Sequence, residues 1–509
     1  MSDLLARADL IVIVVYMAAM MLIGWWVSDG SRDVEGYSVG NREMNGWVVG
    51  FSVLGTFLSS ITFLALPAKV YRDGHWGGYG FGMALPIAAY FAVHYFIPLY
   101  RKRVSLSAYE FLEQRFGYWA RGCAAVSYVT LQLIRVAMVN LLVALAVEPL
   151  LGWGVINTVI VVGAVVIIYD VLGGIKAVIW TDVAQVFVLL GGALWCLFEL
   201  IGRRPGGWSQ YVADLPTGSV SLGPIISSNL AMETFLVVLV YGISENMRNY
   251  GTDQNYVQRM LCSASESDAK KSIWFGALAY LPISLIFCMI GTGLMMLYNV
   301  PIAGDSNALA GATVALPSGI KPDQVFPHFM RHELSPFARG VVIAGILAAA
   351  MSTLDSCLNS MSVTLFVDLW RRLRTKRTSI PDILILRGFT LINGVLGTLL
   401  AIGVFLAYQN ESQSLMNLWW KYAGVAGAGL FGLFLLAWLM PRIPSWGAIA
   451  ATVAGLPPLV WGLSNSDKIH GNLVGIASFL TMLAVGGLVL LGVKSGRIAP
   501  NNRAEGTQG

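Results

Sequence analysis

Residues 341–369 read VVIAGILAAAMSTLDSCLNSMSVTLFVDL, an apolar stretch long enough to cross a membrane but polar at its centre. The polar residues Ser352, Asp355, Ser356 and Asn359 are spaced i, i+3, i+4 and i+7, which is one face of an α-helix. An Asp at the centre of a membrane helix costs about 2.5–3.5 kcal/mol on insertion scales, so it persists where it faces protein or an ion. The stretch therefore predicts a membrane helix that turns one stripe of oxygen atoms inward.

The residue types in this stripe suit a hard monovalent cation. Such ions prefer several hydroxyl, carbonyl or carboxylate oxygens to imidazole or thiolate ligands. An alternative is that the hydroxyls bond back to their own helix while Asn359 holds two helices together. Asp355 favours the cation site, because a carboxylate gains little from bonding to its own helix.

The composition predicts an all-α polytopic membrane protein. Of 509 residues, 56% are hydrophobic and 12% are charged, against about 25% charged in soluble proteins. Hydropathy predicts roughly thirteen spans. They are centred near residues 18, 56, 88, 135, 162, 188, 240, 285, 350, 395, 428, 452 and 482. No separate soluble domain fits in the remainder. The five cysteines form no CxxC pair, which argues against a zinc site or a disulfide framework.

Basic residues predict the orientation in the membrane. They cluster after the third, seventh and ninth spans and in the tail, which is one side if the spans alternate. The residues are Arg101, Lys102, Arg103, Arg115, Arg121, Arg259, Lys270, Lys271, Arg371, Arg372, Arg374, Lys376, Arg377, Lys494, Arg497 and Arg503. The positive-inside rule makes that side cytoplasmic, with the N-terminus outside, in a cell membrane such as the bacterial inner membrane. These loops account for the net charge of +5, so no nucleic-acid partner is expected.

Two spans carry signs of interruption. The span 47–66 contains a Gly55-Thr56 break, and the span 235–250 turns polar midway at Gly242, Ser244, Glu245 and Asn246. Two interrupted helices, each opening a set of about five spans, indicate an inverted-repeat transporter with a site at the membrane midplane. Unwound backbone at Gly55 would free carbonyls for a cation; alternatively, Gly55 only permits close helix packing.

Asp182 lies at the expected cytoplasmic start of a span. It is either solvated at the interface or part of a site. If its span packs against 341–369, then Asp182, Ser352, Asp355 and Ser356 surround a cation. Two carboxylates in one low-dielectric site repel each other, so either a cation lies between them or one carboxylate holds a proton.

Arg135 is the other outlier, in the middle of a span that runs over 119–151. It lies about 22 Å from either end at 1.5 Å per residue, so its head group does not easily reach water. It needs an anionic partner, which is either a structural carboxylate such as Glu245 or the carboxylate of a substrate. No nucleophile-base set and no phosphate loop is present, so an enzyme is not expected.

Five segments resemble successive signatures of the sodium:solute symporter family. They are LSSITFLALPAK (58–69), SLSAYEFLEQRFG (105–117), LGGIKAVIWTDVAQ (172–185), TDQNYVQR (252–259) and AAAMSTLDSCLNS (348–360). The resemblance implies a leucine-transporter-like fold of five-plus-five inverted repeats. The implied division is a leading helix and cytoplasmic loop (1–45), a first repeat (46–201), an external loop (202–232), a second repeat (233–440), two additional helices (441–493) and a cytoplasmic tail (494–509).

The resemblance also implies site residues. A sodium site would use backbone carbonyls of Gly55, Leu58 and Ala349 with the hydroxyls of Ser352 and Thr353. A possible second sodium site, described in the sialic acid transporters of the family, maps to Asp182, Ser352, Asp355 and Ser356. Those members carry Ser where Asp355 stands, so the extra carboxylate either tightens the second site or couples a proton.

The solute site that the resemblance implies has five residues: Phe57, Ser59, Thr62, Arg135 and Asn246. Ser59, Thr62 and Arg135 match positions that the sialic acid transporters use. Phe57 replaces a Thr, and residues 80–82 lack a polar Gln. These losses remove hydrogen bonds that a polyol would need.

The function expected from these observations is sodium-coupled import of a small organic solute by alternating access. The solute is expected to be a carboxylate, such as sialic acid or another sugar acid, and the protein a monomer that contacts membrane lipid. Na⁺ is the expected coupling ion, with no organic cofactor. Alternatives are a symporter of a neutral sugar or amino acid, and a proton-coupled symporter that uses Asp355 and Asp182. A channel would show rings of like charge, and a sensor would need signalling domains that the short tail does not hold.

Overall fold

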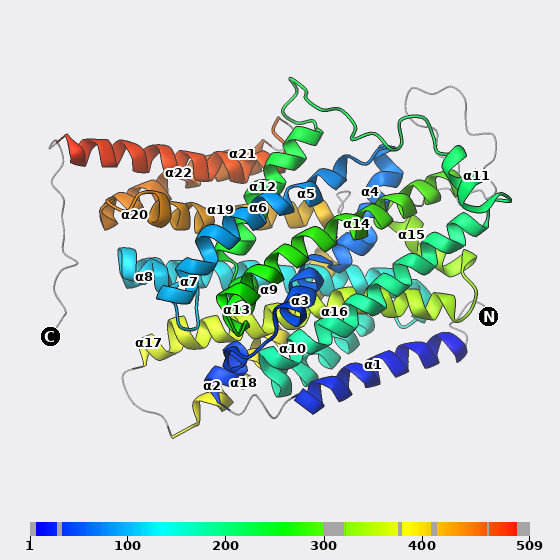
Figure 1. Ribbon diagram of the computed structural model, residues 1–509, viewed down its shortest axis with the longest axis horizontal. Coiled ribbons are helices and arrows are strands. Elements are labelled where there is room, and N and C mark those ends of the chain that lie inside the picture. The colour runs from blue at the N-terminus through cyan, green and yellow to red at the C-terminus, as the bar shows by residue number, and fades with distance from the viewer. Residues whose placement is uncertain are drawn as a thin grey trace.

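The computed structural model describes residues 7–27, 33–298, 320, 322–374, 379–408, 415–465 and 468–495. Within them the secondary structure is helical apart from one isolated bridge between Met44 and Ser263, and most helices run along the long axis of the molecule (Figure 1). The helices are α1 (Arg7–Val27), α2 (Val34–Val39), α3 (Gly46–Phe57), α4 (Leu66–Asp73), α5 (Gly80–Met83), α6 (Leu85–Phe91), α7 (Ile97–Arg103), α8 (Glu110–Phe116), α9 (Tyr118–Leu151), α10 (Val155–Gly202), α11 (Gly207–Ala213), α12 (Phe235–Thr252), α13 (Gln254–Cys262), α14 (Glu266–Tyr298), α15 (Pro322–Glu333), α16 (Ala338–Thr364), α17 (Arg371–Leu373), α18 (Asp382–Tyr408), α19 (Leu415–Leu439), α20 (Ser445–Ala454), α21 (Leu456–Ser464) and α22 (Gly471–Lys494).

The predicted all-α membrane architecture is confirmed. In the described residues, eight helices are long and apolar enough to cross a membrane, and a ninth candidate span is the bent pair of 46–57 and 62–73. Helices suit this environment because each satisfies its own backbone hydrogen bonds in lipid. The predicted number of thirteen spans stays a prediction.

α10 is too long for one crossing. Its 48 residues would extend about 72 Å, more than twice the roughly 30 Å of a bilayer core. The helix bends at Gly174, which has φ 59° and ψ −167°. Since this backbone conformation is essentially restricted to glycine, Gly174 is the residue that permits the bend.

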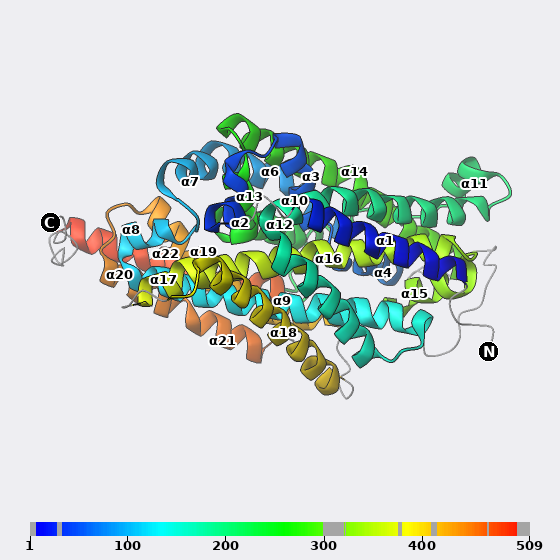
Figure 2. The same cartoon turned by 90° about the horizontal axis from the view of Figure 1, so that it is seen from below.

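α16 lies inside the bundle between α1, α9 and α10 (Figures 1 and 2). In an 18-residue apolar window of the span Ala338–Leu373, which contains α16, 94% of the window is buried inside the protein. The corresponding value for α1 is 17%. α16 is therefore the buried centre of the bundle, whereas α1 exposes most of its side chains on the outer surface of the protein.

Ion pairs hold both ends of the α16 span. At its start, Asp9 of α1 accepts the backbone N–H groups of Phe337 and Gly340, both at 3.0 Å, and pairs with Arg339 at 2.6 Å. At its far end, Arg121 of α9 pairs with Asp368 at 2.6 Å. Burial makes each pair costly to break, because the remaining charge would be left uncompensated.

The structure corrects the predicted positions of both interruptions. Gly55 is still helical, and the backbone leaves the helix at Leu58, three residues later. Gly55 instead allows α10 to approach: an added Cβ would lie 3.2 Å from Val186 Cγ2 and 3.6 Å from Asp182 Cβ. This is the close-packing role that the sequence left as the alternative for Gly55.

The second interruption was also predicted too early. α12 runs unbroken through 242–246 and gives way to α13 at Asp253, whose side chain caps α13 by accepting from Asn255 N at 3.0 Å. Glu245 pairs with Arg248 one turn later on the same helix, so this polar stretch serves side-chain pairing and not unwinding.

Gly174→Ala is predicted to lower the free energy of unfolding by about 1–3 kcal/mol, because alanine does not adopt this backbone conformation without strain. The matched control is Gly191→Ala on the same helix, where an added Cβ meets nothing within 4 Å. That change is expected to be neutral or slightly stabilising. Thermal unfolding of the two variants in detergent measures the difference, and equal midpoints would contradict the role given to Gly174.

Candidate functional site

The end of α3 brings backbone oxygens against α16. Because the last four carbonyls of a helix have no intrahelical donor, the turn that ends at Phe57 presents free acceptors. Ser352 Oγ lies 3.3 Å from the Gly55 carbonyl and 3.2 Å from the Ala349 carbonyl. Thr353 Oγ1 donates to the same Ala349 carbonyl at 3.2 Å.

Four of the five residues predicted for the first sodium site therefore meet at one point. Gly55, Ala349, Ser352 and Thr353 are buried and supply only oxygen atoms that face one another. Leu58 lies at the break itself and is also buried. A cluster of carbonyl and hydroxyl oxygens with little access to water is what a desolvated Na⁺ requires.

The second predicted set is also buried, but a cation of the protein lies within it. Arg259 Nη2 donates to Asp182 Oδ2 at 2.8 Å and to Ser356 Oγ at 2.6 Å. Arg259 Nε donates to Ser52 Oγ at 2.7 Å, and Ser52 in turn donates to Asp182. Asp182 is fully buried, so the solvated interface position considered from the sequence is wrong.

Asp355 has partners other than Arg259. Tyr169 OH donates to its Oδ2 at 2.9 Å, and the backbone N–H of Ser356 donates to its Oδ1 at 2.6 Å. Ser356 Oγ bonds back to the Ser352 carbonyl at 2.6 Å. Ser356 Oγ also lies 3.5 Å from Asp355 Oδ1, so Asp182 has a guanidinium as its counterion, whereas the hydrogen bonds to Asp355 come from neutral groups.

Sequence reasoning missed Arg259 as a site residue. It was counted among the basic loop residues, but the structure buries it completely. Arg121, counted in the same way, is 6% exposed and ion-paired. Two features of the sequence could have identified Arg259: it belongs to the signature segment TDQNYVQR, and Asp182 needs a counterion.

A cavity lies beside the first oxygen cluster and encloses about 1110 Å³, part of it open to solvent. Its wall includes Thr353 together with four predicted solute residues, which are Phe57, Ser59, Thr62 and Arg135. The other lining residues are Thr56, Ala65, Leu66, Lys69, Gly78, Phe81, Val139, Glu233, Val238, Tyr241, Glu245, Asn249, Tyr256 and Tyr280. The ion cluster and the cavity therefore share a wall.

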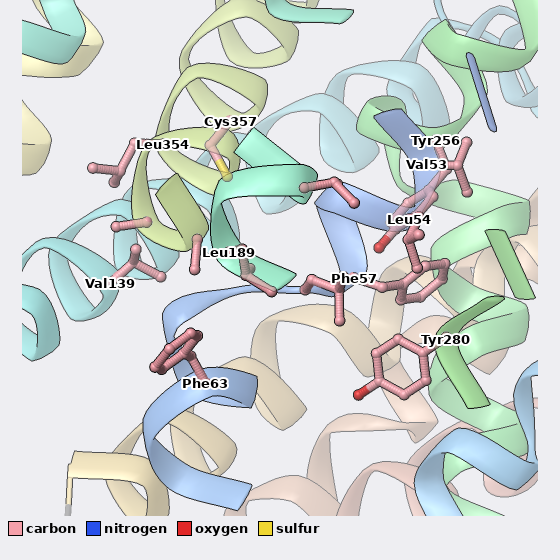
Figure 3. Close-up of a cluster of buried hydrophobic side chains, with 14 of the residues drawn as sticks. Val53, Leu54, Phe57, Phe63, Val139, Leu189, Tyr256, Tyr280, Leu354 and Cys357 are labelled. Atoms are coloured by element: carbon pink, nitrogen blue, oxygen red, sulfur yellow. The ribbon is translucent and has the colours of Figure 1, made fainter. Parts of the chain in front are cut away.

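Aromatic rings form one side of this cavity. Figure 3 shows the helix interrupted between Phe57 and Phe63, with Phe57, Tyr256 and Tyr280 gathered on one side of the break. The Phe57 ring centroid lies 4.7 Å from that of Tyr256 and 6.1 Å from that of Tyr280. Such a surface accepts the apolar face of a small organic molecule.

Arg135 forms an ion pair with Asp253, a carboxylate that was not suggested from the sequence. Its Nη1 lies 3.3 Å from Asp253 Oδ2, whereas Glu245 pairs with Arg248. Asp253 Oδ1 also accepts from Tyr128 OH at 3.2 Å and Gln132 Nε2 at 3.1 Å. Arg135 is thereby oriented while its side chain still lines the cavity.

Asn246 does not reach the cavity wall. It is fully buried, and its amide donates to the Phe81 carbonyl at 3.4 Å. The side chain therefore faces α5. Gly242, one turn earlier, allows α12 to come this close, because an added Cβ would lie 3.1 Å from Phe81 Cα.

The comparisons with known proteins agree on one family. Residues 37–455 match the model of the sodium:solute symporter family. The chain is 30% identical over 456 residues to the sodium/sialic acid symporter SiaT of Proteus mirabilis (strain HI4320), covering 89% of this chain and 88% of that protein. It is 28% identical over 477 residues to the sodium/sialic acid symporter NanT of Aliivibrio fischeri (strain ATCC 700601 / ES114), covering 92% and 90%.

A solved structure of a sodium-coupled symporter is also similar to this chain. A Na⁺-coupled sialic acid symporter in a substrate-bound outward-open state superposes with a TM-score of 0.84 at 26% identity, covering 97% of this chain and 99% of that one. These relatives are transporters and not enzymes, as predicted. The chain belongs to the sodium:solute symporter family.

Proposed function

We propose that this symporter couples the entry of Na⁺ to the uptake of a small organic carboxylate, which binds in the cavity against Arg135. One observation carries the proposal: Thr353 of the oxygen cluster and Arg135 line the same cavity. An ion bound at the first site therefore lies next to the solute, and each stabilises the closed, fully loaded protein when the other is present.

The proposed coupling ion site consists of the carbonyls of Gly55, Leu58 and Ala349 and the hydroxyls of Ser352 and Thr353. The hydrogen bonds of Ser352 and Thr353 to these carbonyls support it, because the same atoms can turn their lone pairs to a cation. A second Na⁺ beside Asp182, Asp355 and Ser356 is a further part of the proposal. Since Arg259 is the counterion of Asp182, this second ion would serve Asp355.

The proposed solute class follows from Arg135 and from the relatives. A guanidinium binds a carboxylate through two parallel hydrogen bonds, and SiaT and NanT are named for a sugar acid. On the aromatic side formed by Phe57, Tyr256 and Tyr280, Phe57 contributes no hydrogen-bonding group. Sialic acid is therefore one candidate, and a smaller or less hydroxylated acid is the other.

Transport is proposed to occur by alternating access between inverted repeats at 46–201 and 233–440, with the N-terminus outside and the C-terminus in the cytoplasm. The bend between α3 and α4 and the break between α12 and α13 support two such repeats. A monomer is proposed as the transporting unit.

The experiment that tests this function is thermal stabilisation of the purified protein by organic acids, neutral sugars and amino acids, each in sodium and in potassium. A ligand that binds only the folded protein raises the unfolding midpoint. A sodium-dependent shift with an acid is expected. Shifts only with neutral sugars or amino acids would overturn the carboxylate, and equal shifts in potassium would overturn sodium coupling.

Ser352→Ala is predicted to raise the sodium concentration at half-maximal uptake at least tenfold, equivalent to about 1.4 kcal/mol of lost sodium binding. The variant removes one proposed ligand and leaves the carbonyls of Gly55 and Ala349 in place. The control is Ser362→Ala on the same helix, whose hydroxyl donates at 2.7 Å to the carbonyl of Asn359. Uptake into proteoliposomes is measured for both variants over a series of sodium concentrations. If the two variants needed the same sodium concentration for half-maximal uptake, Ser352 would not be a sodium ligand.

Arg135→Lys is predicted to weaken binding of the acid about tenfold or more. The shift of the unfolding midpoint that sodium causes in the absence of solute is expected to stay the same. Lysine preserves the charge that Asp253 needs but lacks the planar fork that holds a carboxylate. Arg371→Lys, at a side chain that is 40% exposed, is the control. Competition binding with the acid reports the change, and unchanged affinity would return Arg135 to a purely structural role.

A further inference from the structure

Asp170 is a buried carboxylate for which the proposed function has no use. It lies on α10, is 1% exposed, and neither carboxylate oxygen has a hydrogen-bond partner within the described part of the chain. An isolated buried carboxylate is costly, so Asp170 requires either a cation or a proton. The preceding residue, Tyr169, donates to Asp355 at 2.9 Å, which places Asp170 next to the second candidate ion site.

On one side, the backbone of α10 at Asp170 lies close to α2 and α18. Tyr37 OH lies 2.9 Å from Thr390 Oγ1 and 3.3 Å from the Asp170 carbonyl. Arg387 Nη2 lies 3.4 Å from the Leu172 carbonyl, about half a turn further along α10. These contacts fix the register of the two helices and place the turn that carries Asp170 against the turn that carries Thr390.

On another side, the same region is lined by polar groups of α2, α13 and α16. Gln258 Nε2 donates to Asn359 Oδ1 at 2.7 Å and to the Ser38 carbonyl at 2.5 Å. Asn359 belongs to the polar stripe of α16, one turn beyond Asp355 and Ser356. Several buried side-chain atoms of these residues and of Asp170 have no hydrogen-bond partner in the described part of the chain: Ser38 Oγ, Asp170 Oδ1 and Oδ2, Gln258 Oε1 and Asn359 Nδ2.

We call Tyr37, Ser38, Asp170, Gln258, Asn359 and Thr390 the inner polar cluster. Buried polar atoms are almost always hydrogen-bonded, so the five unpartnered atoms of this cluster call for an explanation. The cluster offers hydroxyl, carbonyl, amide and carboxylate oxygens and no sulfur or imidazole. That set of ligands suits Na⁺ and not a transition metal.

The charges of the region favour an additional cation. Asp170, Asp182 and Asp355 bring three carboxylates into the bundle, and Arg259 is hydrogen-bonded only to Asp182 among them. Tyr16 of α1 donates to Met351, and Tyr37 of α2 lies against the Asp170 carbonyl; both side chains are neutral. Arg387 of α18 donates to the Leu172 carbonyl. Like charges in a low-dielectric interior repel strongly, so mobile cations are the natural counterions of Asp170 and Asp355.

We infer that Asp170 and the inner polar cluster form a transient Na⁺ site, which an ion occupies after it leaves the oxygen cluster at Ser352 and passes Asp355. The inference rests on the sodium coupling proposed above. The polar stripe of α16 gives the direction of the route, from Ser352 past Asp355 to Asn359. A site of this kind must bind weakly, because an ion that is to be released has to leave it again.

The decisive variant is Asp170→Asn, which keeps the size of the side chain and removes the charge. Sodium-driven net uptake into proteoliposomes is expected to fall about tenfold, because the ion loses its ligand on the way out. Solute-induced thermal stabilisation at saturating sodium is expected to stay unchanged, since the first site and Arg135 are intact. Asp170→Glu should retain more uptake than Asp170→Asn, and Glu43→Gln, at a side chain that is 67% exposed, should behave like the unmodified protein.

Wild-type uptake and an unchanged sodium dependence in Asp170→Asn would show that Asp170 is a neutral structural acid and would overturn the inference. A defect that varies with pH but not with sodium would make Asp170 a proton site and would also overturn it. If Asp170→Asn does not fold, the variants Tyr37→Phe and Thr390→Val test the site instead. Slowed uptake with intact solute binding would support the site, and normal uptake in both variants would refute it. If uptake by the unmodified protein did not depend on sodium, the proposed function itself would be refuted.

Discussion

The guanidinium of Arg259 joins four helices at one buried point. It extends from α13, bonds to Ser52 of α3 and Asp182 of α10, and reaches Ser356 of α16. Removing one member of a buried ion pair typically costs about 3–5 kcal/mol, because the other charge is left unpaired. These contacts therefore fix how α3 lies against α16, and this register brings the Gly55 carbonyl to Ser352. The geometry of the proposed first sodium site therefore depends on an ion pair that is not itself part of that site.

α13 also connects this point to the solute cavity. Asp253 caps the helix and pairs with Arg135, while Arg259 lies at the other end of the same short helix. A solute that displaced Arg135 would act through Asp253 on the helix whose Arg259 contacts Asp182 and Ser356. This is a physical connection between the solute and ion regions through packed and hydrogen-bonded groups.

The sequence predicted the all-α class and the α16 helix with its polar stripe, because helical periodicity and the cost of polar groups in lipid act locally. The grouping of Gly55 with Ser352 came from the resemblance to the family. The sequence placed the two helix breaks too early. The position of a break depends on tertiary partners, such as the packing of α10 on Gly55 and the capping of α13 by Asp253. Arg259 and Asp170 were missed for a related reason, since their environments are built from helices that are distant in the sequence.

The charges around the cavity give a reason for coupling an anion to sodium. Arg135 is balanced by Asp253, and Arg248 by Glu245, so the protein holds no excess positive charge at these two pairs. A carboxylate that enters the cavity therefore adds a negative charge without a fixed counterion. A Na⁺ at the proposed site beside Thr353, which lines the same cavity, would supply the missing charge at short range in a medium of low dielectric constant. On this argument the solute and the ion stabilise each other electrostatically, and Arg135 contributes orientation more than net charge.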